Sequence, residues 1–180
     1  MLGSTPAKPK NSPFDFSTVS GSVDRENTYK EYLTVHSSKY PQNAVSVDIL
    51  NFDAEKSHGV HAESGYQGKE EALVTDDGSL VTWNVDVPEE GFYNISVTYI
   101  GTPSRNVSME RSVSIGGKIP FSGADTLTFN RLWHDGGDIR VDNRGNQIRP
   151  SQTEVFDWQT LLLKSHSGYE VEPYKFYFTK

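Results

Sequence analysis

Hydrophobic and polar residues alternate over much of the chain from Val45 onward, and this period of two predicts half-buried β-strands. The most regular run covers residues 81–87, in which Val81, Trp83, Val85 and Val87 alternate with polar residues. Since neighbouring side chains of a strand point to opposite faces, this register places Trp83 in the core. The turn Pro88–Gly91 then leads into a return strand whose apolar face is Tyr93, Ile95, Val97 and Tyr99.

Further short strands are predicted along the rest of the chain. They lie at Val45–Ile49, Met109–Ile115, Thr126–Phe129, Phe156–Leu163 and Tyr174–Phe178, and the pair Gly116–Gly117 suits a two-residue hairpin turn. Seven or more short strands separated by turn residues indicate an all-β fold, an antiparallel β-sandwich. We expect this domain to span residues 42–180.

One segment before the strands has the period of a helix instead. Thr28 and Glu31 have the spacing of a capping box, in which each side chain accepts a hydrogen bond from the other residue's backbone amide. Tyr29, Tyr32, Leu33 and His36 then lie on one helical face. Residues 23–41 are therefore predicted as a short helix and its connector. The Pro-, Ser- and Lys-rich residues 1–22 are predicted as a flexible spacer, with no signal peptide at the start.

The stretch between Trp133 and Ser151 departs from the strand pattern. It is dense in Asp, Asn, Gly and Arg, and the sequence predicts a long irregular connection with Trp133 before it and Trp158 after it. Connections of this length inside a compact domain are usually functional or disordered. We therefore treat it as the main candidate site.

Composition narrows the possible functions. The chain of 180 residues has a formal charge of −7, which argues against nucleic acid or an anionic membrane as partner. It has no run of about 18 apolar residues that could span a membrane. The absence of cysteine excludes disulfides, thiol nucleophiles and zinc fingers. No nucleophile elbow, phosphate loop or dinucleotide motif is present, so we expect no enzyme.

Several motifs resemble those of galactose-binding-like jelly rolls. The motifs are the run Trp83–Tyr99 with Val-Pro-Glu-Glu-Gly, the strand and hairpin Arg111–Lys118, and Gly65-Tyr-Gln-Gly68. Together they resemble carbohydrate-binding modules of families 6 and 35 over residues 45–121. The second half, including Arg131–Trp133, Asp142–Asn146 and Glu172–Tyr177, resembles a jelly-roll segment of the surface solute-binding lipoproteins of Gram-positive sugar transporters.

The resemblance implies a non-catalytic, extracellular or cell-surface bacterial module that binds an oligosaccharide or polysaccharide. Flat aromatic rings and planar polar groups bind sugars, and an Arg fork also matches the carboxylate of a uronic acid. The candidate ligand-binding residues are Trp133, Asp138, Arg140, Asp142, Asn143, Arg144, Asn146, Arg149, Trp158 and Tyr169. Two alternatives are a salt-bridged network that stiffens the loop, with both Trp residues in the core, and disorder.

A structural calcium ion is a weaker expectation. The resembling families place two Glu near the first strand, where this chain has Asp48, Asp53 and Glu55, and Asp135 with Asp138 could also contribute. The alternative is that these carboxylates are simply solvated.

Two points stay open from the sequence. The resemblance implies two further strands after Phe178, so we expect the final strand to be paired by a second copy, a downstream fragment or the segment Phe14–Val23. The alternative to sugar binding is a structural or interaction domain that docks another domain of its parent protein.

Overall fold

The computed structural model describes residues 28–36, 39–103, 107–166, 168 and 170–180. In chain order its elements are α1 (Tyr29–Val35), β1 (His58–Ser64), the 3-10 turn η2 (Tyr66–Gly68), β2 (Glu71–Leu80), β3 (Gly91–Asn94), β4 (Ser96–Tyr99), β5 (Met109–Arg111), β6 (Leu127–Phe129), β7 (Leu132–Asp135), β8 (Arg140–Val141), β9 (Gln147–Ile148), β10 (Gln152–Val155), β11 (Gln159–Leu162) and β12 (Lys175–Phe178). The all-β fold with one short helix is confirmed. No helix of the described ranges has the length and hydrophobicity that crossing a membrane requires.

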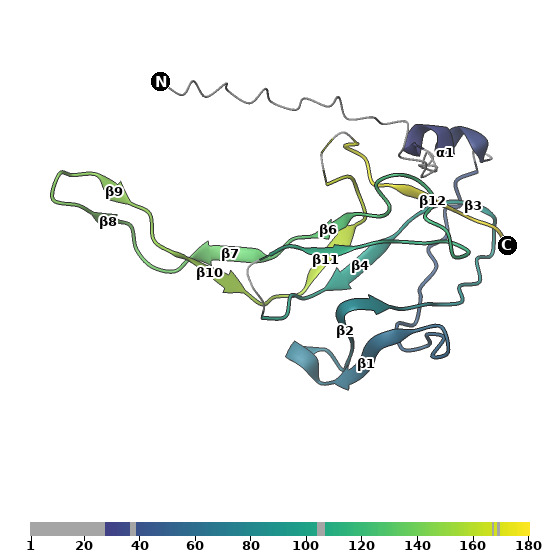
Figure 1. The fold of residues 1–180 in the computed structure, drawn as a ribbon, viewed down its shortest axis with the longest axis horizontal. Coiled ribbons are helices and arrows are strands. Elements are labelled where there is room, and N and C mark those ends of the chain that lie inside the picture. The colour runs from purple at the N-terminus through teal and green to yellow at the C-terminus, as the bar shows by residue number, and fades with distance from the viewer. Residues whose placement is uncertain (1–27, 37–38, 104–106, 167, 169) are drawn as a thin grey trace, which may run out of the picture.

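The described strands form six antiparallel two-stranded ladders. The pairs are β1–β2, β3–β12, β4–β11, β5–β6, β7–β10 and β8–β9. In Figure 1 the ladders of β3, β4, β6, β11 and β12 lie together in the body, and α1 lies beside β12. The pairs β7–β10 and β8–β9 project to one side.

An aromatic core joins these elements. Phe121, Leu127, Leu163 and Phe176 are almost completely buried, and Tyr32, Phe92 and Tyr174 complete the cluster. The Phe121 ring lies 4.9 Å from that of Tyr174 and 5.4 Å from that of Phe176. Burying a side chain of this size contributes roughly 1.5–3 kcal/mol, so these few residues carry much of the folding free energy.

The predicted helix and its capping box are confirmed. The Thr28 amide donates to Glu31 Oε2 at 2.9 Å, and the Glu31 amide donates to Thr28 Oγ1 at 3.2 Å. The predicted apolar face meets the core, because Tyr32 is buried and the His36 ring stacks on Tyr177 at 4.3 Å.

The strand β12 has a partner on each edge. Along one edge it pairs with β3, in the register Phe176 to Tyr93. Along the other, the amide of Lys175 donates to the Tyr29 hydroxyl at 2.9 Å and that of Tyr177 donates to the Tyr32 hydroxyl at 2.6 Å. Within the described residues β3 and α1 thus cover the two edges of β12, and the expected pairing with a second copy, a downstream fragment or the segment Phe14–Val23 stays a prediction. The segment Phe14–Val23 lies outside the described residues.

Two predicted strands form no ladder. The segments 45–49 and 81–87 belong to no ladder, and the second takes part in a single bridge, from Trp83 to Phe52, which follows the first segment in the chain. Trp83 is half-buried, outside the core cluster, and its Nε1 donates to the Ile49 carbonyl at 3.1 Å. The prediction that Trp83 is a core residue is wrong, because the strand expected to place it there has no neighbour along most of its length.

Other predicted features are confirmed. The pair Gly116–Gly117 forms the turn between Ile115 and Lys118, and β6, β11 and β12 fall within the strands predicted for them. The strands β1 and β2 were not predicted.

We expect that the α1 hydroxyls are needed for the stability of β12. Replacing Tyr29 or Tyr32 with Phe keeps the ring but leaves a backbone amide of β12 without its acceptor. Each substitution should lower the free energy of unfolding by about 1–3 kcal/mol, measured by urea denaturation.

Tyr40→Phe is the control, because the Tyr40 ring packs on Phe92 while the residue is 50% exposed. This variant should unfold like the parent. Equal stability of all three variants would show that water replaces the tyrosine hydroxyls without cost.

Candidate functional site

The stretch expected to be irregular is a projecting β-hairpin, which we call the β-arm (residues 131–155). Its inner ladder pairs β7 with β10, from Leu132 opposite Val155 to Asp135 opposite Gln152. Its outer ladder pairs Arg140 with Ile148 and Val141 with Gln147. Figure 1 shows the β-arm extending away from the body. The prediction of an irregular connection is wrong, because the turn at its tip aligns two short strands that are too polar to give a strand signal.

A buried ion pair attaches the β-arm to the body. The Arg131 guanidinium pairs with the Glu154 carboxylate, and both side chains are nearly buried. Arg131 also donates to the carbonyls of Thr102 and Val107, each at 2.7 Å. Since charge-assisted hydrogen bonds are directional and strong, they hold the base of the β-arm in one orientation.

The tip of the β-arm is closed by Asp142. Its carboxylate accepts hydrogen bonds from the amides of Arg144 and Asn146, at 2.9 and 2.8 Å, and from the Asn146 side chain at 2.9 Å. These hydrogen bonds lower the pKa of Asp142, and the bond from the Asn146 side chain has the largest effect. Gly145 has the positive φ of 84° that this turn requires. Asp142 and Asn146, two predicted sugar contacts, are thus engaged in the turn itself.

The other predicted contacts on the β-arm face solvent. Trp133, Asp138, Arg140, Asn143, Arg144 and Arg149 are all exposed. Within the described residues, the guanidinium groups of Arg140, Arg144 and Arg149 have no hydrogen-bond or ion-pair partner. The alternative of a salt-bridged network among these Asp and Arg residues is therefore wrong for the described structure, and the ion pair of Arg131 and Glu154 was not among the residues selected for it.

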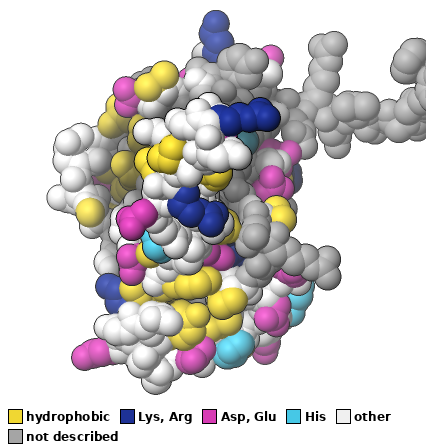
Figure 2. All heavy atoms as spheres, turned by 90° about the vertical axis from the view of Figure 1, so that its left-hand side faces the viewer, with side chains coloured by type: hydrophobic (Ala, Val, Ile, Leu, Met, Phe, Trp, Pro, Cys, Tyr) yellow, Lys and Arg dark blue, Asp and Glu magenta, His cyan; other side chains and the backbone are white. Residues whose placement is uncertain are grey.

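Apolar side chains are exposed along the same β-arm. The exposed fractions are 37% for Leu132, 39% for Trp133, 56% for Ile139, 63% for Val141 and 44% for Ile148. Figure 2 faces the side of the molecule to which the β-arm projects, and it shows hydrophobic side chains at the surface among charged ones.

Trp158 belongs to a different place from Trp133. Its Nε1 donates to the Gln67 carbonyl at 3.0 Å, and its ring packs edge-on against Tyr66 at 6.4 Å with Lys69 Nζ 5.9 Å from the ring centre. Trp158 thus fastens the turn η2 to the body, outside the β-arm. Tyr169 lies outside the described residues.

Three of the candidate calcium ligands, Asp48, Asp53 and Asp135, accept hydrogen bonds from neighbouring groups of the chain. Asp53 pairs with Lys56 at 2.8 Å, and this contact is the largest cause of its lowered pKa. Asp48 accepts from the Leu50 amide at 3.0 Å, and Asp135 accepts from the Gln152 side chain. Glu55 is exposed. Among the described residues, no three His, Cys, Asp or Glu side chains come together as a metal site.

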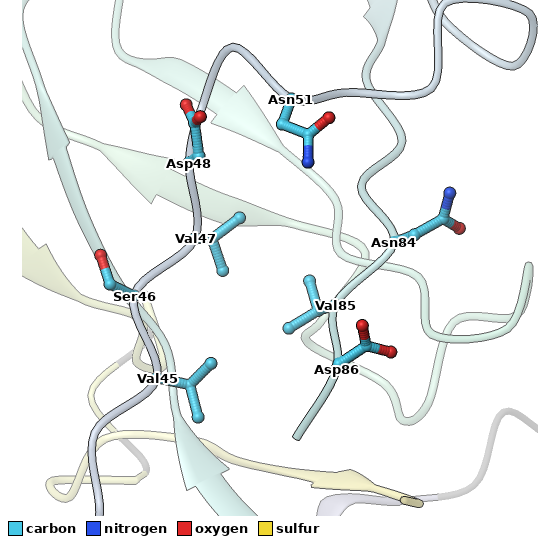
Figure 3. Close-up of a pocket in the computed structure, with 8 residues that line it drawn as sticks. All are labelled: Val45, Ser46, Val47, Asp48, Asn51, Asn84, Val85 and Asp86. Carbon is cyan, nitrogen blue, oxygen red and sulfur yellow. The ribbon is translucent and has the colours of Figure 1, made fainter. Parts of the chain in front are cut away.

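A second feature is a groove between the two strand-like segments that have no ladder, which we call the valine slot. It holds about 270 Å³ and is lined by Val45, Ser46, Val47, Asp48, Asn51, Asn84, Val85 and Asp86. In Figure 3 the side chains of Val45, Val47 and Val85 point into the space between the two segments. Sequence reasoning missed the slot because it assumed that both segments pair with neighbours.

Comparison with protein-family models, with curated proteins and with solved structures gave no match to this chain. The resemblance to carbohydrate-binding modules therefore stays a prediction. The β-arm and the valine slot are the two features of the described chain from which a function can be argued.

The bend in the β-arm should depend on Gly136. A Cβ atom there would lie 2.5 Å from Thr153 Oγ1 and 2.9 Å from the Ser151 carbonyl, to which the Gly136 amide donates. We expect Gly136→Ala to displace β10 from β7, with loss of amide-exchange protection across the inner ladder.

Gly137→Ala is the matched control, because a Cβ atom at Gly137 would meet nothing within 4 Å. Its exchange pattern should equal that of the parent. If Gly136→Ala keeps the protection of the inner ladder, the close approach at this bend does not shape the β-arm.

Proposed function

We propose that the protein is a non-catalytic structural module whose β-arm joins one copy of the chain to another. The observation that carries this proposal is the exposure of apolar side chains near the tip of the β-arm, above all Ile139 and Val141, which are two positions apart in the chain and 56% and 63% exposed. Neighbouring apolar side chains that a projecting element leaves exposed favour an interaction site. An interaction domain was the alternative that the sequence left open.

The construction of the β-arm supports this role. The buried pair of Arg131 and Glu154 and the closed turn at Asp142 hold it in shape before any partner binds, which lowers the entropy lost on association. Trp and Arg are also the residues most enriched in the energetic centres of interfaces, and the β-arm presents Trp133 with three unpartnered arginines.

The proposal predicts that the chain self-associates and that Val141 is needed for it. Val141→Asp places a charge on a side chain that is 63% exposed in the monomer and buried on association. We expect the dissociation constant, measured by sedimentation velocity over a concentration series, to rise by at least about tenfold, which is roughly 1.4 kcal/mol.

Val171→Asp is the control, because Val171 is 84% exposed and lies outside the β-arm. It should associate like the parent. A parent chain that remains monomeric over the series, or equal effects of the two substitutions, would contradict the proposal.

Glycan binding is a second candidate, favoured by the exposure of Trp133. Trp133 is 39% exposed, and it lies opposite Glu154 in the inner ladder of the β-arm. A flat exposed ring beside planar polar groups suits the apolar face and the hydroxyls of a sugar. This candidate function also includes the other properties that the sequence resemblance implies. They are a jelly-roll sandwich, a cell-surface location and a structural calcium ion.

The glycan candidate predicts binding that depends on the arginine fork. Arg→Lys at the true contact among Arg140, Arg144 and Arg149 should weaken binding nearly as much as Arg→Ala, because lysine keeps the charge but cannot form two parallel hydrogen bonds. Calorimetric titration with uronic-acid and neutral oligosaccharides measures this. Full binding by all three Lys variants, or no binding by the parent, would contradict it.

A further inference from the structure

The valine slot combines a strand pattern with an absence of strand pairing. Both of its walls, within 45–49 and 81–87, alternate apolar and polar residues as strands of a sheet do. Yet within the described residues the backbone amides of Val45, Val47, Val85 and Val87 donate no hydrogen bond. Extended backbone of this kind is a template for pairing with a further strand.

The geometry of the slot fits an added strand. The Phe52–Trp83 bridge and the hydrogen bond from the Asp53 amide to the Thr82 carbonyl, at 2.7 Å, join the two walls at one end. Beyond this point they separate, and Val45, Val47 and Val85 face the space between them (Figure 3). Val47 is 42% exposed, so the apolar lining is open to solvent.

We propose that the valine slot accepts the outer ladder of the β-arm, β8 and β9, from a second copy of the chain. This inference rests on the proposed function and names the surface to which the β-arm binds. Each of the two strands has a single partner in its own copy, so its outer edge has free amides and carbonyls to pair with a wall of the slot. Ile139 and Val141, two positions apart in the chain, supply exposed apolar side chains for the valines, and Ile148 lies on the other face of the outer ladder.

Charge complementarity favours this occupant. Residues 138–149 contain three Arg and two Asp and have a formal charge of +1, which leaves −8 for the rest of a chain whose total is −7. The slot carries Asp48 and Asp86 beside its valines, and the Asp86 carboxylate has no partner among the described residues. The unpartnered arginines of the β-arm can pair with these carboxylates.

The two surfaces cannot meet within one copy as the structure stands. In Figure 1 the β-arm projects away from the segment that links α1 to β1, and Val45–Asn51 lie on that segment. Since β-arm and slot are different surfaces, the contact is heterologous, and copies join head to tail into a ring or an open chain.

A mixing experiment with two variants tests this arrangement. Val47→Asp spoils the slot and leaves the β-arm intact, whereas Val141→Asp spoils the β-arm and leaves the slot intact. We expect each variant alone to associate at least about tenfold more weakly than the parent. In an equal mixture, the β-arm of the Val47→Asp copy can still enter the slot of the Val141→Asp copy.

The mixture should therefore form a dimer of twice the 20.1 kDa chain mass, seen by light scattering, and grow no further. Circular dichroism of each variant checks that it is folded, and Val171→Asp again serves as the control for an added charge.

The outcomes separate the two proposals. If Val141→Asp weakens association while Val47→Asp leaves it at the parent level, or if the mixture stays monomeric, the β-arm binds elsewhere and the slot inference is wrong while the proposed function stands. If the parent does not associate at all, both are wrong.

Discussion

The contact between α1 and β12 brings together parts of the chain that are far apart in sequence. The hydroxyls of two tyrosines, one turn apart on α1, accept hydrogen bonds from alternate backbone amides of β12. The strand β3 pairs with the opposite edge of β12. Burial raises the pKa of Tyr29 and Tyr32, so both hydroxyls stay neutral donors and acceptors well above neutral pH. Their rings pack on Phe121, which lies between the helix and β12 in the core. A strand edge is thus covered by a helix through side-chain oxygens instead of by another strand.

The β-arm depends on this core through β6. Leu127 and Phe129 of β6 are buried, and the Tyr99 hydroxyl donates to the Asn130 carbonyl at 2.9 Å just before the chain enters the β-arm. Arg131 follows at once and forms the buried ion pair with Glu154 on the returning strand. The buried strand β6 therefore leads directly into the ion pair at the base of the β-arm. These contacts orient the base of the β-arm relative to the core.

How far the sequence predicts the structure depends on how local each interaction is. The capping box, the Gly116–Gly117 turn and the aromatic strand β12 are encoded within a few residues, and all three were predicted. The β-arm was missed as structure, although most of the selected site residues lie on it, because its strands are too polar for a strand signal and Arg131 meets Glu154 across 23 positions. Trp158 was grouped with Trp133 by proximity in sequence, yet it packs on η2, more than 85 residues earlier.

The sequence predicts a paired strand at residues 81–87, and the reason why this prediction fails differs from the reason at the β-arm and at Trp158. The alternation of apolar and polar residues indicates which side chains can be buried on one face of a sheet. It does not indicate which segment of the chain forms the neighbouring strand. Natural sequences usually agree with their folds at both the local and the global level, so a strong strand pattern without a ladder is a conflict that requires a cause. Here the conflict occurs in two segments that face each other across three valines, with a polar rim of Asp48 and Asp86. A strand supplied by a second copy removes the conflict at both walls at once, and the β-arm is the part of the described chain with free strand edges, apolar side chains and unpaired positive charge together.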